Sequence, residues 1–147
     1  MGCGVDFMDS DKYVLYIGSS GLSLGDSDAY TNPSEFDKKK KVALSKYYTK
    51  LLTIAGYTEE QAASKVDDMY KFESMIAPYI KGDSEYSKDD EKFKNMYNVM
   101  TADELDKMAP NLKIKEYLKN GKVDNADKII LQEPKWLQGL NIRNQIL

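Results

Sequence analysis

The chain has 147 residues, with 31% charged and 41% hydrophobic side chains, which is ordinary for one globular domain. A net charge of −3 argues against a nucleic-acid partner, which would require a basic face. No stretch approaches the roughly 18 apolar residues of a membrane span, and the first residues lack the pattern of a signal peptide, so localisation stays open.

The chain contains no histidine and a single cysteine, Cys3. Nucleophile pairs of Ser or Cys with His are therefore excluded, as are zinc sites built from His or several Cys ligands. An internal disulfide is excluded too. We expect this chain alone to hold no metal or cofactor.

Two short strands are predicted near opposite ends of the chain. Residues 13–17 (YVLYI) are rich in β-branched and aromatic side chains and lead into a turn, and residues 128–132 (KIILQ) have the same character. Neither segment has another apparent partner, so we predict that they pair as a small two-stranded sheet.

A long antiparallel helical hairpin is predicted over residues 33–55 and 59–80. Asn32 and Pro33 are suited to begin the first helix, and Gly56 to end it in a left-handed conformation. Thr58 and Gln61 form a capping box that begins the second helix. The basic run 38–41 is interpreted as a solvated helix face.

Glu73 interrupts the apolar stripe of the second helix. Its neighbours three and four positions away are Met69, Tyr70, Ile76 and Ala77, so no cation on the same helix can pair with it. Since an unpaired carboxylate is costly to bury, we predict a structural role for Glu73, bonded to another segment.

Shorter helices are predicted in the second half of the chain. Ser87 is expected to cap a helix carrying Phe93, Met96 and Tyr97, Thr101 forms a capping box with Glu104, and Asn111 is expected to cap a further helix. Pro134 is expected to begin the last one. The predicted fold is therefore mainly α, a single helical domain over residues 1–147.

The order of these pieces resembles the amino-terminal, non-catalytic region of the neprilysin-like zinc metallopeptidases, which include neprilysin, endothelin-converting enzymes and bacterial oligopeptidases. The resemblance extends from about Val5 to Asn141. It depends on four features in order: Gly21-Leu22-Ser23-Leu24 before a tyrosine, Glu73 to Ala77, Tyr97-Asn98 before the Thr101 helix, and the strand 128–132 followed by Pro134, Trp136 and Leu137. Gly25 departs from the proline common in the family, and Ala29-Tyr30 from its tyrosine pair.

The resemblance implies that this chain is an internal part of a cap domain, with the catalytic domain absent. In the family the cap faces the carboxy-terminal catalytic domain, which carries the zinc, and limits substrates to oligopeptides. The zinc-binding His-Glu-x-x-His motif is not in this chain, so no catalytic residue is carried over. The expected partners are that catalytic domain and, through it, oligopeptide substrates. Without the catalytic domain, we expect the chain to expose an apolar patch that this domain would cover, and therefore to self-associate weakly.

Two other functions are compatible with the residues alone. The chain could be a freestanding helical module that binds proteins or peptides, or a hydrolase that uses carboxylates such as Glu73. The structural residues predicted here are Glu73, Thr58, Gly56 and Thr101.

Overall fold

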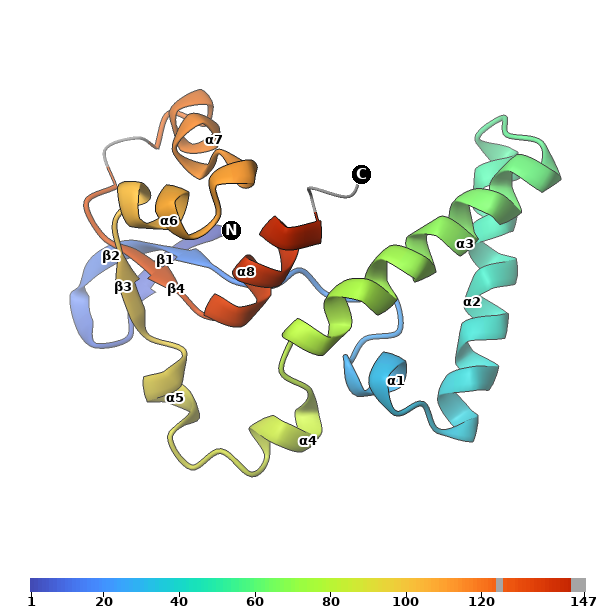
Figure 1. Ribbon diagram of the computed structural model, residues 1–147, viewed down its shortest axis with the longest axis horizontal. Coiled ribbons are helices and arrows are strands. Elements are labelled where there is room, and N and C mark those ends of the chain that lie inside the picture. Colours follow the sequence, from blue (N-terminus) through green and yellow to red (C-terminus); the bar gives the residue numbers. More distant parts are fainter. Residues whose placement is uncertain (124–125, 144–147) are drawn as a thin grey trace. The chain divides into compact units, whose positions relative to one another are not determined.

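The structure, a computed structural model, describes residues 1–123 and 126–143. It divides into two compact units (Figure 1). The sheet unit combines residues 1–20 with the described chain from Ser87 onward, and the helical unit is the continuous segment Gly21–Tyr86.

The sheet has four strands among the described residues: β1 (Gly2–Asp6), β2 (Asp9–Ile17), β3 (Asn98–Met100) and β4 (Ile129–Leu131), in the order β1-β2-β4-β3. β2 and β4 pair in parallel, with Leu15 opposite Ile129, which confirms the predicted pairing of the two ends. β1 and β3 add antiparallel outer strands. The predicted two-stranded sheet was therefore wrong, and the fold is mixed α/β rather than mainly α.

The two outer strands lack the pattern by which strands are recognised. β1 contains Gly2 and Gly4, and β3 is only three residues long. The first residues of β2, Asp9 to Lys12, are polar and mostly exposed. Glycine and aspartate have low β-propensity, so hydrogen bonding to the neighbouring strand, and not local preference, fixes these segments.

The core of the sheet unit lies between one face of the sheet and three helices, α6 (Ala102–Met108), α7 (Ile114–Asn120) and α8 (Pro134–Arg143). Alternate residues of the two central strands point to this face. The buried cluster comprises Leu15, Ile17, Ile129 and Leu131 from the strands with Leu105, Ala109, Ile114, Leu118 and Leu137 from the helical segments.

Two predicted helix starts in this unit were wrong. Ser87 begins no long helix: the chain forms only the short α5 (Lys92–Asn95), on which Phe93 is exposed. Asn111 lies within a 3-10 turn, Pro110–Leu112, and α7 follows Lys113, whose φ of 48° is left-handed. Pro134 does begin α8, as predicted.

The helical unit contains the predicted hairpin, formed by α2 (Glu35–Ile54) and α3 (Glu59–Ile76) and preceded by α1 (Asp28–Thr31). Figure 1 shows the two long helices side by side. Pro78 ends the second arm, because residues Ala77–Tyr79 continue as a 3-10 turn before α4 (Asp83–Tyr86).

The first arm begins two residues later than predicted. Ser34, and not Asn32, is the cap, because the Ser34 hydroxyl accepts from the Asp37 amide and the Asp37 carboxylate accepts from the Ser34 amide. The core of this unit is small: Leu24, Ala29, Val66 and Tyr70 are buried, and α2 contributes Leu44, Tyr48 and Leu52, which are only partly buried. Among the described helices, none has the length and apolar character that a membrane crossing requires.

Candidate functional site

Glu73 lies at the centre of a polar cluster in the helical unit. Its Oε1 accepts hydrogen bonds from the Ser23 amide at 2.9 Å and the Ser23 hydroxyl at 2.8 Å, and its Oε2 accepts from the Tyr30 hydroxyl at 2.5 Å. The structure therefore places one partner of Glu73, Ser23, on the loop before α1 and the other, Tyr30, on α1 itself, 50 and 43 residues away in sequence. This carboxylate attaches both segments to α3, and the Ser23 hydroxyl also lies 3.5 Å from the Met69 sulfur of the same helix.

The same loop has two further attachments. The Tyr30 hydroxyl also accepts from the Leu24 amide at 3.1 Å, and Lys40 of α2 donates to the Leu24 carbonyl at 2.7 Å. Burial raises the pKa of Tyr30, and its bond to the Glu73 carboxylate raises that pKa further. Tyr30 is therefore held as a neutral donor, which is the form that the Glu73 carboxylate requires.

The other three predicted residues lie at helix ends. Thr58 and Thr101 each cap a helix, α3 and α6, through capping boxes with Gln61 and Glu104. Gly56 has a φ of 101° in the connection between α2 and α3. These positions shape the scaffold, and the structure does not bring them together with Glu73 into one site.

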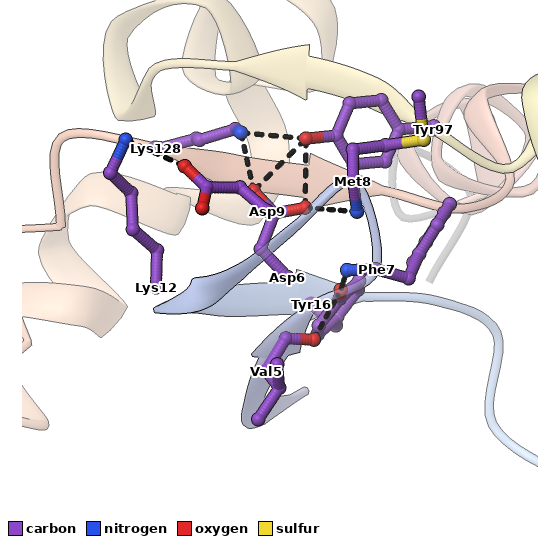
Figure 2. A network of polar contacts seen from close by, with 9 residues as sticks. All are labelled: Val5, Asp6, Phe7, Met8, Asp9, Lys12, Tyr16, Tyr97 and Lys128. Atoms are coloured by element: carbon purple, nitrogen blue, oxygen red, sulfur yellow. Dashed lines mark hydrogen bonds and ion pairs between the residues drawn. The ribbon is translucent and has the colours of Figure 1, made fainter.

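A second polar cluster, unrecognised in the sequence, lies in the sheet unit (Figure 2). Asp6 at the end of β1 is completely buried and ion-paired with Lys128, at 2.5 Å. The Tyr97 hydroxyl lies 2.9 and 3.0 Å from the two Asp6 oxygens, and Lys128 is 2.6 Å from that hydroxyl. The Met8 amide completes the set at 2.9 Å.

The electrostatics of this cluster favour its charged form. The hydrogen bond from Lys128 lowers the pKa of Asp6 to about 2; burial opposes this shift, and the bonds from Met8 and Tyr97 support it. The bonds to Asp6 and Tyr97 raise the pKa of Lys128. Because Lys128 stays protonated and Asp6 is buried, neither group is suited to act as a nucleophile or base on a bound substrate.

Aromatic side chains surround this cluster. Phe7 packs edge-on against Tyr97, with ring centroids 4.8 Å apart, and lies stacked near Tyr16 at 6.1 Å. The Tyr16 hydroxyl donates to the Val5 carbonyl at 2.9 Å, and the Phe7 amide donates to that hydroxyl. The turn between β1 and β2 is thereby fixed to the segments before β3 and β4.

Neither cluster offers the chemistry of a hydrolytic centre. Both carboxylates are occupied by donors from the protein, and in the part of the chain that the structure describes no three His, Cys, Asp or Glu side chains group as metal ligands would. Of the residues in the second cluster, the sequence analysis singled out only Tyr97, as part of the Tyr97-Asn98 pair that contributes to the family resemblance. Asp6 and Lys128 are 122 positions apart, and no local pattern connects them.

Comparison with known proteins identifies the family. A family model described as peptidase family M13 matches residues 1–143. The chain is 29% identical to an endothelin-converting enzyme homolog of Locusta migratoria over 96% of its length, and 26% identical to neprilysin-3 of Drosophila melanogaster over 94%. It spans only about a fifth of each relative, 20% and 18%.

A solved structure has the same fold. The cryo-EM structure of the Mycobacterium tuberculosis zinc metalloprotease Zmp1 in its open state superposes on 96% of this chain with a TM-score of 0.74 and 18% identity, and the chain covers 22% of it. Together with the family model, which spans nearly the whole chain, this identifies the chain as part of the amino-terminal region of a member of peptidase family M13.

Proposed function

We propose that this chain is an internal part of the non-catalytic cap of an M13 zinc metalloendopeptidase, where it limits access of substrates to a catalytic domain carried elsewhere in the polypeptide. Oligopeptides are the proposed substrates of the complete enzyme. The proposed partner of this chain is the carboxy-terminal catalytic domain of the same protein, and zinc is the proposed metal of that domain.

One observation carries this proposal. The amino-terminal M13 model matches residues 1–143, and the chain, which spans about a fifth of its relatives, contains no histidine. The two polar clusters support it, since each uses its charged groups to attach one segment to another. A region of this kind can position and shield, while the reacting groups belong to another part of the protein.

The first test is genetic. The reading frame should continue in the genomic sequence around this coding segment, and the downstream part should encode a His-Glu-x-x-His helix. The complete protein, purified with its zinc, should cleave a short quenched-fluorescence peptide and should lose that activity with a chelator. Stoichiometric zinc and chelator-sensitive cleavage by the 147-residue chain alone would contradict the cap role.

The second test concerns access. In the complete protein, Glu73→Gln should loosen the loop at Ser23 and increase cleavage of a long unfolded protein relative to the short peptide. Asp67→Asn, on the exposed face of the same helix, is the matched control and should leave this ratio unchanged. An unchanged ratio in Glu73→Gln would show that the Glu73 cluster does not control the access of substrates.

A freestanding binding module is the second candidate, favoured by the large apolar side chains that stay exposed. They include Phe36, Tyr47 and Ile54 of the helical unit and Val5, Met8 and Tyr13 of the β1–β2 hairpin. The exposed side chains of the β1–β2 hairpin support weak self-association of the isolated chain, which light scattering at high concentration would detect. Calorimetric titration with a mixed oligopeptide library would detect a module that binds peptides by itself.

A further inference from the structure

The outer face of α2 carries a second apolar stripe, distinct from the one that faces the core. Phe36, Ala43, Tyr47 and Ile54 are spaced by seven, four and seven residues, so they project from the same side of the helix. Phe36 and Ile54 are each 73% exposed and Tyr47 57%. Leu44, Tyr48 and Leu52, by contrast, pack toward α3. We call the exposed set the outer stripe.

Lysines border the outer stripe. Lys39, Lys46 and Lys50 are exposed and follow one edge of it. The acidic residues of α2, Glu35 and Asp37, lie in its first turn, where Glu35 pairs with Lys38 and Asp37 bonds to Ser34. Glu59 of α3 lines a hollow together with Lys46 and Lys50, so the three lysines leave a surplus of positive charge beside the exposed apolar side chains.

We propose that the outer stripe docks an amphipathic helix whose apolar face is bordered by Asp and Glu. We infer that this helix comes from the part of the M13 protein outside this chain, an origin that rests on the proposed function. The stripe extends from residue 36 to 54, about 27 Å along the helix axis. Contacts at intervals of seven and four residues fit the face of another helix.

Charge selects among the possible occupants. A second copy pairing antiparallel through α2 would bring Lys39, Lys46 and Lys50 of both molecules to the same side, and such like-charge contacts disfavour the complex. A copy pairing in parallel would leave these lysines without acidic partners. Acidic side chains on an incoming helix would instead pair with these lysines, and their contribution would weaken as salt increases.

Two synthetic helical peptides of about 18 residues, long enough to cover the stripe, test this chemistry on the intact chain. Both carry the same Leu and Ala face; one is bordered by Glu and the other by Lys. Fluorescence anisotropy should show the Glu-bordered peptide binding at least about tenfold more tightly, and amide NMR shifts should change along α2. Equal binding of both peptides, or no binding, would overturn the docking surface.

Substitutions locate the contact. Tyr47→Gln and Ile54→Gln should each weaken binding of the Glu-bordered peptide by about fivefold or more, because each removes a large apolar side chain that the contact would bury. Val42→Gln is the control, since Val42 is also 57% exposed on α2 but lies well away from the stripe. Circular dichroism checks that each variant is folded. An equal loss in Val42→Gln would contradict the assignment.

The origin of the occupant has its own readout. Tyr47 should be oxidised more slowly by hydroxyl radicals in the complete protein than in the 147-residue chain, and equal rates would overturn the inference that the remaining polypeptide covers it. A dimer of this chain that Tyr47→Gln dissociates would show that a second copy is the occupant. The peptide measurements need no enzyme activity, so their failure would not contradict the proposed cap role. Conversely, a gene that encodes no zinc ligands would contradict the cap role and leave the peptide-binding result unaffected.

Discussion

At the scale of single residues, Glu73 accepts three hydrogen bonds from two residues, Ser23 and Tyr30. Replacing it with Ala would leave the Ser23 amide and hydroxyl and the Tyr30 hydroxyl without their acceptor. A part-buried donor without an acceptor costs about 1–3 kcal/mol, so we expect Glu73→Ala to lower the free energy of unfolding of the helical unit by roughly that amount. Urea titration followed by circular dichroism measures it.

Asp67→Ala is the matched control for this substitution. Asp67 is an exposed carboxylate on the same helix, and exposed substitutions usually change stability by less than about 0.5 kcal/mol. A change below about 0.3 kcal/mol for Glu73→Ala would show that the loop donors are solvated instead of held by the carboxylate.

Asp6 makes the sheet unit sensitive to acid. Its pKa is about 2 in the folded chain and ordinarily 3.8, so the folded state favours the ionised form. The stability that Asp6 contributes is present above pH 4 and is lost as the pH falls toward 2. Trp136, the one tryptophan, packs against the core of this unit. Its fluorescence should therefore report easier unfolding by urea at pH 2.5 than at pH 5.

Asp6→Asn should flatten this pH dependence while lowering stability at neutral pH, because Lys128 would lose its charged partner. Asp11→Asn, an exposed position on β2, should keep the full dependence. An Asp6→Asn chain that loses as much stability between pH 5 and 2.5 as the unaltered chain would mean that other carboxylates control acid unfolding.

At the scale of elements, Gly56 fixes the hairpin connection by backbone conformation alone. Its φ is 101°, and a Cβ there would meet no atom within 4 Å. The cost of Gly56→Ala is therefore conformational, and we expect the helical unit to lose roughly 1–2 kcal/mol. Gly21 also has open space around it, but its φ lies outside the left-handed region. Gly21→Ala should be neutral or slightly stabilising. Comparing the free energies of unfolding of the two variants in urea therefore separates backbone strain from the effect of adding a methyl group.

Elements with strong local signals could be predicted from the sequence. The hairpin, its capping box at Thr58 and the capping box at Thr101 follow from residue types only a few positions apart, and the structure contains all three. The strands β1 and β3 depend on pairing partners far away in sequence. Gly2 and Gly4 disfavour a strand, and in the three residues of β3 only Val99 favours one, so the larger sheet was missed.

At the scale of the whole chain, the same distinction explains the candidate clusters. Glu73 stood out because it interrupts a helical stripe, and its need for a distant partner followed from that interruption. Asp6 ends β1 next to the turn at Phe7 and Met8, where an aspartate is ordinary in a sequence. Its burial and ion pair arise only because the tertiary fold brings Lys128 and Tyr97 to it. A buried charged side chain can be inferred from sequence when it interrupts a regular pattern of apolar residues. It cannot be inferred when the residues that bury it come from distant parts of the chain.

The helical unit is a continuous segment, so it should fold when excised. Residues 21–86 contain the hairpin, the Glu73 cluster and their own buried set of Leu24, Ala29, Val66 and Tyr70. A core of this size supplies less than about 5 kcal/mol, so we expect a cooperative but marginal thermal transition by circular dichroism. Val66→Ala, which removes buried methyl groups, should abolish that transition, whereas Val42→Ala on the exposed side of α2 should preserve it. A gradual loss of helicity with no transition in the unaltered fragment would show that the hairpin depends on the rest of the chain.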